Sequence, residues 1–138
     1  MTTIALCFAL LSTHGADGLR GCELAAHAVE AGEAHGIDPR LLLAIGWVET
    51  KWKPWLVGGV GERGALQVRP EYAGLTGDEL AQPGVGVWAG AGALYRWLKR
   101  AHGRVSVALS AYNCGNRGLK LACGTVYSAR VIALAGRW

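Results

Sequence analysis

Glu49 is the residue with the clearest potential for chemistry, because it is the only acidic side chain of the helix predicted over residues 39–52. At 100° per residue, Leu42 lies about 20° and Ile45 about 40° from Glu49 around the helix axis. The carboxyl group therefore lies on an apolar face, where partial desolvation raises its pKa. A carboxylic acid that keeps its proton near neutral pH is suited to general acid catalysis. A lone glutamate near a helix end is more often a surface charge, so the other motifs must decide.

Local signals define the limits of this helix. Asp38 is placed to cap its first turn. Pro39 follows at a first-turn position, where its missing backbone N–H removes no hydrogen bond of the helix. Pro54 prevents the helix from continuing. Gly46, one turn before Glu49, is expected to leave space for a ligand to approach the carboxyl group. Together these signals predict a helix that ends beside an accessible acid.

The rest of the chain predicts a mainly α-helical domain with a glycine-rich loop or small β excursion after the second helix. The excursion corresponds to residues 57–69. A capping-box pattern at Thr76–Glu79 predicts a brief helix that Pro83 ends. Glycines 86, 90 and 92 in a long helical pattern indicate close helix packing. Longer helices are predicted over residues 23–35, 39–52, 85–101, 105–112 and 127–134.

Composition limits the class of protein. A chain of 138 residues with 51% hydrophobic and 17% charged residues fits one folded domain. The net charge of +4 suits an anionic partner such as nucleic acid, acidic lipid or cell-wall polymer. We expect no nucleic acid, because the interleaving of aromatic and basic residues that single strands require is absent. The basic cluster at positions 96, 99, 100 and 104 is interpreted as a solvated helix face.

The cysteines predict disulfides rather than a metal site. Cys7, Cys22, Cys114 and Cys123 contain no C-x-x-C pair, and no histidine lies at a zinc-ligand spacing from them. We therefore expect no metal. A disulfide between Cys114 and Cys123 would close a short loop and contribute about 2–3 kcal/mol. Alternative pairings stay open at this point.

Residues 1–16 have two interpretations. The apolar run Ile4–Leu11, followed by small residues near Gly15 and Ala16, resembles a short signal peptide, although no basic residue precedes it. The alternative is a retained and buried N-terminal segment, which would allow Cys7 to pair with Cys22. The run is too short to span a bilayer, so no stable membrane span is expected. In both cases residues 17–138 are predicted to form the domain.

Several short motifs occur in an informative order along the chain: Glu49-Thr50, Gly64-Ala65-Leu66-Gln67, Ala111-Tyr112-Asn113-Cys114-Gly115 and Tyr127. This order resembles the soluble lytic transglycosylase family of peptidoglycan-cleaving enzymes. That family carries Glu-Ser, Gly-Leu-Met-Gln, Ala-Tyr-Asn-x-Gly and a later tyrosine on a lysozyme-like fold. The resemblance covers residues 22–135. Thr50 departs from the family serine but keeps a hydroxyl, and Ala65-Leu66 changes the predicted lining of the cleft.

The resemblance implies that Glu49 is a single acid/base. It would protonate the glycosidic oxygen between N-acetylmuramic acid (MurNAc) and N-acetylglucosamine (GlcNAc), and then accept the proton of the muramic 6-hydroxyl as a 1,6-anhydro ring closes. Water, a second carboxylate, a metal and an organic cofactor would not be needed. The amides and phenols would donate to the sugar or to Glu49. The substrate-binding residues implied in this way are Thr50, Gln67, Tyr112, Asn113 and Tyr127.

Glu62 supports a rival enzyme. Residues 61–64, Gly-Glu-Arg-Gly, resemble the Gly-Asp-Arg-Gly of goose-type lysozymes, in which the acid helps to position a hydrolytic water. If Glu62 faces Glu49 across a water, the chain would be a muramidase that hydrolyses the same bond. The simpler interpretation pairs Glu62 with Arg63 as a loop charge.

A non-enzymatic alternative is a catalytically silent member of the fold that docks on the wall within a secretion or conjugation machine or a phage virion. The expected location is periplasmic, secreted or virion-associated, and the expected partner is a peptidoglycan glycan strand.

Trp47 is predicted to lie in the core. Trp52 and Trp55 are predicted to pack in the core or at its rim, with stacking on sugars as the alternative.

Overall fold

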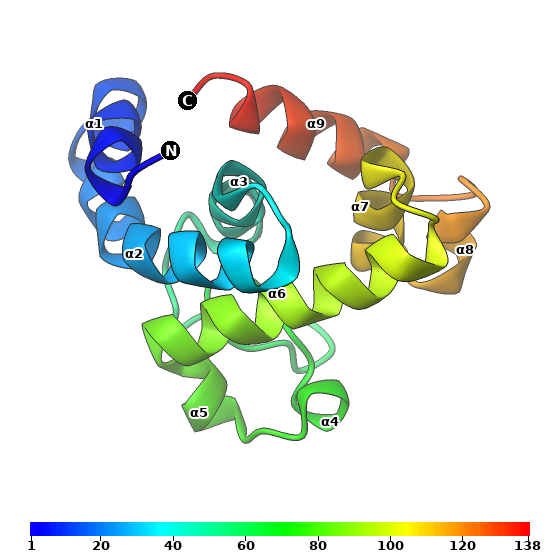
Figure 1. Ribbon diagram of the computed structural model, residues 1–138. Helices are drawn as coiled ribbons and strands as arrows, with labels where there is room; N and C mark the ends of the chain where they lie inside the picture. Colours follow the sequence, from blue (N-terminus) through cyan, green and yellow to red (C-terminus); the bar gives the residue numbers. More distant parts are fainter.

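Helix α3 (Pro39–Thr50) lies at the centre of the fold, and the other long helices pack around it (Figure 1). The computed structural model describes all residues 1–138. Extended structure is limited to two isolated antiparallel bridges, Val57 with Arg63 and Arg63 with Val68, so the predicted mainly α class is confirmed. The other elements are α1 (Thr3–His14), a 3-10 turn (Gly15–Asp17), α2 (Gly18–His35), α4 (Pro70–Ala73), α5 (Gly77–Ala81), α6 (Pro83–Arg100), α7 (Val105–Cys114), α8 (Asn116–Leu119) and α9 (Thr125–Ala135).

The start of α3 follows the predicted signals. The Asp38 side chain accepts a hydrogen bond from the Arg40 backbone N–H at 2.9 Å, and Pro39 occupies the first turn. The helix ends at Lys51, which adopts a left-handed conformation with φ 52°. Leu42 and Ile45 are fully buried. The sequence periodicity therefore places the correct face of α3 in the core.

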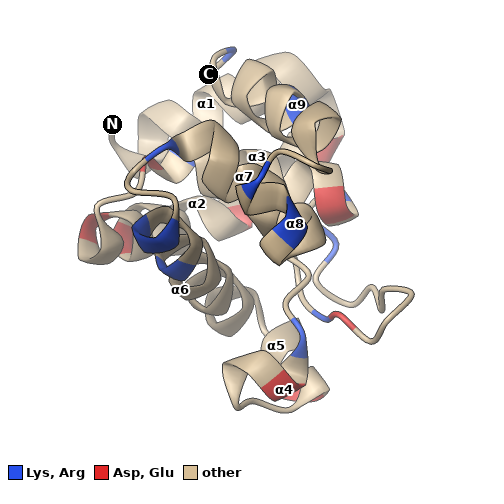
Figure 2. Ribbon diagram, turned by 90° about the vertical axis from the view of Figure 1, so that its right-hand side faces the viewer, with Lys and Arg blue, Asp and Glu red and all other residues tan.

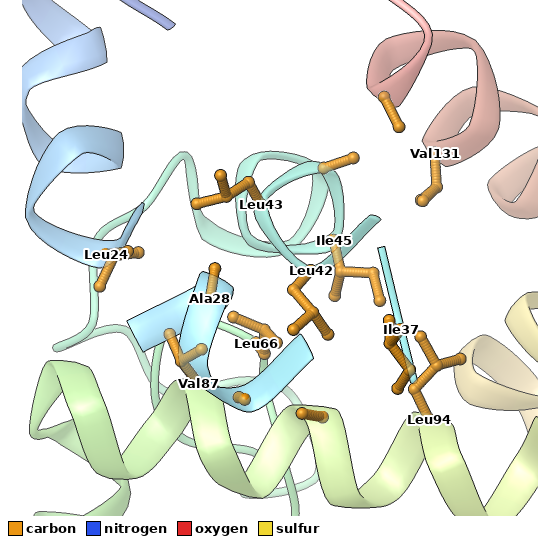
Figure 3. Packing of buried hydrophobic residues seen from close by; sticks show 14 of the residues in the cluster. Leu24, Ala28, Ile37, Leu42, Leu43, Ile45, Leu66, Val87, Leu94 and Val131 are labelled. Atoms are coloured by element: carbon orange, nitrogen blue, oxygen red, sulfur yellow. The ribbon is translucent and has the colours of Figure 1, made fainter. Parts of the chain in front are cut away.

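The core surrounds α3 on several sides. Figure 3 shows Leu43 and Ile45 of α3 close to side chains of other elements. These neighbours are Leu24 and Ala28 from α2, Leu66 from the excursion loop, Val87 and Leu94 from α6, and Val131 from α9. Burying a side chain of this size contributes about 1.5–3 kcal/mol. The core therefore fixes the last turn of α3, and with it Glu49, relative to α6 and α9.

Close packing between α6 and the excursion loop depends on glycine. A Cβ atom at Gly90 would overlap the side chain of Leu66, and one at Gly86 would lie 2.6 Å from the Leu80 carbonyl oxygen. The close packing predicted for these two glycines is confirmed. Gly92 is different, because a Cβ there would meet only Arg96, at 3.6 Å. The prediction was wrong for that position.

The N-terminal apolar run is a helix that packs on α2. Leu6 and Leu10 of α1 are fully buried, and a disulfide joins Cys7 to Cys22. This is the arrangement expected for a retained segment; whether residues 1–16 are removed by a signal peptidase stays a prediction. Helix α2 begins at Gly18 rather than at the predicted Glu23.

Two short helices, α4 and α8, were not predicted, and Pro83 begins α6 instead of only ending the brief helix before it.

The second disulfide joins Cys114 to Cys123, as the spacing suggested, and no free cysteine remains. None of the helices combines the length and apolarity that a bilayer crossing requires. No group of three or more His, Cys, Asp or Glu side chains is arranged to hold a metal ion.

Basic residues lie on several elements, and one cluster of them is at the end of α6. Figure 2 shows Lys and Arg on the last turns of α6 and on α8. The side chains of Arg96, Lys99, Arg100 and Arg104 are all exposed. This agrees with the interpretation of the cluster as a solvated face.

Candidate active site

Glu49 lies in the last turn of α3, partly buried among groups from three other elements. Burial raises the pKa of its carboxyl group above the ordinary value. An approach of the Tyr127 hydroxyl acts in the opposite direction, and the negative charge of Glu62 raises the pKa further. Desolvation is the largest of these effects. The raised pKa shifts the carboxyl group toward its protonated form, which is the form that a proton donor requires.

Tyr127, in the first turn of α9, turns its phenol toward Glu49. Its hydroxyl oxygen is buried and completes no hydrogen bond of good geometry, but Glu49 is close enough for the hydroxyl to influence the pKa of the carboxyl group. Burial and the Glu49 charge both raise the pKa of Tyr127. The phenol is thus a neutral donor whose available partner is Glu49 or a bound ligand.

Tyr112, near the end of α7, contributes a second phenol to the surroundings of Glu49. Its hydroxyl donates a hydrogen bond to the backbone carbonyl of Leu66 at 2.6 Å. Burial, followed by the charge of Glu49, raises the pKa of Tyr112 well above its usual range. Because its proton is directed at Leu66, this phenol supports the excursion loop and is not free to donate to a sugar.

Thr50 requires a correction. The residue is only 3% exposed, and its hydroxyl contacts the backbone carbonyls of Gly46 at 3.0 Å and Ala65 at 2.9 Å. A hydroxyl enclosed in this way has no surface to offer a glycan. Its role is internal, since it joins the end of α3 to the excursion loop. The predicted substrate contact is not supported by this geometry.

Gln67 has a similar internal role. The residue adopts φ 53°, and its side-chain Nε2 donates to the carbonyls of Leu56 at 3.1 Å and Gly64 at 3.0 Å. Both amide hydrogens are thereby directed into the loop, so the predicted donation to an N-acetyl group is not available. The Oε1 atom remains as an acceptor. Substrate binding by Gln67 stays a prediction, and Oε1 is the side-chain atom left to serve it.

A hydrogen bond within its own turn of the excursion loop holds the side chain of Glu62. Its Oε1 accepts a hydrogen bond from the Val60 backbone N–H at 2.8 Å. Arg63 pairs instead with Asp78 at 3.4 Å, so the predicted pairing of Glu62 with Arg63 is wrong. A Cβ atom at Gly58 would lie 2.8 Å from Glu62 Oε1 and 2.6 Å from Gln67 Oε1. Glycine at position 58 thus allows the two side chains to approach the same stretch of backbone.

Asn113 lies in the last turn of α7 with its side chain exposed. The residue before it, Tyr112, faces inward, so adjacent positions of one motif serve different surfaces. Asn113 is exposed, whereas Tyr112 is half-buried and its hydroxyl is directed at the Leu66 carbonyl. The structure places four of these side chains near one another: the charge of Glu62 acts on the pKa of Glu49, and the charge of Glu49 acts on the pKa values of Tyr112 and Tyr127.

The tryptophans belong mainly to the core. Trp52 is 1% exposed, and its indole N–H donates to the Leu43 carbonyl at 2.8 Å. A Cβ atom at Gly46 would lie 2.9 Å from this indole. Gly46 therefore makes room for Trp52, and the expectation that it leaves space for a ligand was wrong. Trp47 packs on Trp52 with ring centroids 4.8 Å apart, whereas Trp55 is 60% exposed.

Two features of the site had no clear signal in the sequence. Trp52 follows Lys51 with a second positive φ, of 60°, which folds the indole back under the end of α3. The backbone carbonyls of Leu66 and Ala65 receive the hydrogen bonds of Tyr112 and Thr50. Because backbone acceptors have no sequence signature, such contacts appear only once the chain is folded.

The fold and the site define a lysozyme-like domain with a partly buried acid, and comparison with known proteins agrees. Residues 27–132 match the family described as "Transglycosylase SLT domain". The chain therefore belongs to this family.

Relatives with similar sequences are longer than this chain. It is 37% identical over 94 residues to membrane-bound lytic murein transglycosylase F 1 of Alkalilimnicola ehrlichii, covering 62% of this chain and 19% of the relative. It is 29% identical over 113 residues to membrane-bound lytic murein transglycosylase F of Hahella chejuensis, covering 77% of this chain and 21% of the relative. The chain thus spans about a fifth of the length of these relatives.

A solved structure shows the same fold. An inactive mutant of lytic transglycosylase Slt from Pseudomonas aeruginosa superposes with a TM-score of 0.70 at 20% identity. The match covers 80% of this chain and 23% of that one. The predicted lysozyme-like architecture is confirmed.

Proposed function

We propose that this chain is a peptidoglycan lytic transglycosylase that cleaves the β-1,4 bond between MurNAc and GlcNAc and leaves 1,6-anhydro-MurNAc ends. The observation that carries the proposal is Glu49, a partly buried carboxyl group of raised pKa that faces the neutral phenol of Tyr127. Membership of the SLT family supports it. An isolated surface glutamate would have neither the burial nor the phenol.

The proposed reaction uses one carboxyl group twice. Protonated Glu49 gives its proton to the glycosidic oxygen as the bond from the MurNAc C1 breaks. The resulting carboxylate then accepts the proton of the MurNAc 6-hydroxyl, whose oxygen bonds to C1. The proton count balances, and Glu49 returns to its starting state. Tyr127 would stabilise the carboxylate while it is charged, since a phenol donates to an anion more strongly than to a neutral acid.

A hydrolytic outcome is the second candidate. The negative charge of Glu62 acts on Glu49, so the two carboxyl groups lie near each other. Inverting hydrolysis requires a second carboxylate that activates a water. Glu62 already accepts the Val60 N–H, so one of its carboxylate oxygens is engaged within the loop. This contact favours transglycosylation, in which no water is activated.

Digestion of purified peptidoglycan tests the proposal. Wild type is expected to release muropeptides lighter by one water than reducing-end products, and Glu49→Gln is expected to release none. Glu33→Gln, which alters an exposed acid on α2, serves as the matched control and should behave as wild type. Equal amounts of product with wild type and with Glu49→Gln would rule out the enzymatic hypothesis. The alternative of a catalytically silent wall-docking domain would then stand. Reducing-end products that depend on Glu62 would establish the muramidase.

The proposed substrate also locates the protein. A domain that cleaves glycan strands acts where peptidoglycan is found, which fits a periplasmic, secreted or virion-associated protein. A secretion, conjugation or phage assembly that needs a local opening in the wall would be a suitable partner.

A further inference from the structure

We propose that the disulfide between Cys114 and Cys123 positions Tyr112 and Tyr127 around Glu49, so that these two cysteines are positioning residues for the site. The inference rests on the proposed function for its consequence in catalysis. Its geometric content stands separately, because it concerns which elements surround one carboxyl group.

The two cysteines flank the two phenols. Cys114 ends α7, whose Tyr112 lies half a turn earlier. Cys123 lies two residues before the start of α9, whose first turn holds Tyr127. The covalent bond joins them with their Cα atoms 6.3 Å apart. In Figure 1, α7 and α8 lie on the right, and α9 runs along the top with its first turns next to α7. The disulfide therefore fixes the distance between the elements that supply both phenols.

Noncovalent contacts between α7 and the start of α9 act at the same junction. The Ser128 hydroxyl donates to the Ser106 carbonyl at 2.8 Å, and the Ser110 hydroxyl lies 3.2 Å from the Gly124 carbonyl. A Cβ atom at Gly124 would lie 2.5 Å from the Ser110 carbonyl oxygen. These contacts involve the first and middle turns of α7. The disulfide adds a covalent link between the last turn of α7, which holds Tyr112, and the residues before α9.

This junction affects the environment of the Glu49 carboxyl group. Tyr127 of α9 and Glu62 of the excursion loop act on that carboxyl group. The Glu49 charge and Arg96 of α6 act on Tyr112 of α7, whose hydroxyl is directed at the Leu66 carbonyl. Both tyrosines belong to the elements that the disulfide joins. If the junction opens, water reaches Glu49, and the desolvation that dominates its environment is lost.

Direct titration of Glu49 by carbon-detected NMR tests the proposal. In the double variant Cys114→Ser/Cys123→Ser, the pKa of Glu49 is expected to fall toward its ordinary value, because hydration favours the carboxylate. The matched control Cys7→Ser/Cys22→Ser removes the other disulfide, between α1 and α2, and should leave this titration unchanged. An unaltered Glu49 titration in the first variant, with the fold intact by circular dichroism, would overturn the proposal.

Chemical reduction provides the same test without refolding. In the Cys7→Ser/Cys22→Ser background, a water-soluble phosphine supplies two electrons to the remaining disulfide, giving two thiols while the phosphine takes oxygen from water. Alkylation and mass spectrometry then confirm the two thiols. The Glu49 pKa should fall on reduction and return on reoxidation. A titration that ignores the redox state contradicts the inference even if the Ser variant fails to fold.

Kinetics distinguish positioning from general stability. Loss of the Cys114–Cys123 bond should lower kcat about tenfold with KM changed less than about twofold, since orientation of an acid acts mainly on the chemical step. A change confined to KM would contradict the positioning role. If wild type releases no anhydro products, the proposed function fails, whereas the titration still decides this inference.

Discussion

The Tyr112 hydroxyl donates to the Leu66 carbonyl at 2.6 Å, and this bond joins α7 to the excursion loop beside Glu49. Leu66 is itself enclosed, since Gly90 of α6 allows its side chain to enter the core. A hydrogen bond and a packing contact thus act on one loop residue from two helices. The position of the loop relative to Glu49 depends on both.

Tyr112→Phe removes the donor and leaves the Leu66 carbonyl without its partner. The free energy of unfolding should fall by about 1–3 kcal/mol, the cost of an unsatisfied buried acceptor. Urea denaturation measures the change. Tyr95→Phe is the control, because Tyr95 is 37% exposed. Equal stability of wild type and Tyr112→Phe would show that water replaces the phenol without loss.

Gly90→Ala should destabilise the protein by about 1–3 kcal/mol, because the new methyl group overlaps Leu66 and the core must shift. Gly92→Ala offers a matched control on the same helix, since a Cβ there meets only Arg96 at 3.6 Å. That variant should gain about 0.5–1 kcal/mol from the higher helix propensity of alanine. Thermal or urea unfolding compares the two. A Gly90→Ala protein as stable as Gly92→Ala would contradict the packing described for the loop.

Glu49 should make stability depend on pH in a defined direction. Its pKa is higher in the folded protein than the ordinary value of 4.5, so the folded state binds more protons than the unfolded state between these two values. The free energy of unfolding contributed by Glu49 therefore falls as pH rises from the unfolded pKa through the folded one. Glu49→Gln removes this loss.

The measurement for this prediction is urea unfolding of wild type and Glu49→Gln at acidic and neutral pH. The variant should be more stable than wild type at neutral pH, and the difference should shrink in acid. Glu33→Gln should show no such pattern. A variant that is less stable at neutral pH would indicate that the carboxylate is stabilised in the fold.

Tyr127→Phe removes the hydroxyl that lowers the pKa of Glu49. The Glu49 titration should therefore move upward, because the site stays dry while the anion loses its donor. Loss of one preorganised donor is expected to lower kcat about a hundredfold. Tyr72→Phe, at a residue 69% exposed, controls for loss of a phenol elsewhere. An unchanged titration would place the Tyr127 hydroxyl out of reach of Glu49.

The parts of the fold that could be predicted are those determined by neighbouring residues. Asp38 and Pro39 define the start of α3, and the helical period places Glu49 on the side that the structure finds partly buried. Such signals act within a turn or two of helix. They require no knowledge of the excursion loop.

The errors concern contacts between residues distant in sequence. Thr50 contacts the Ala65 carbonyl and Gln67 contacts that of Leu56, so both polar side chains are occupied within the protein. Gly46 receives Trp52 because the chain reverses at Lys51. A motif gives the type of a side chain, but its partner depends on how the loop returns to the helix.

The most direct test of the central claim is digestion of purified peptidoglycan in water enriched in oxygen-18. If Glu49 transfers the proton of the MurNAc 6-hydroxyl and closes the anhydro ring, the new ends carry no label, and Glu49→Gln yields no new ends. Incorporation of one labelled oxygen per cleaved bond would show that water attacks C1 and would contradict the single-residue mechanism.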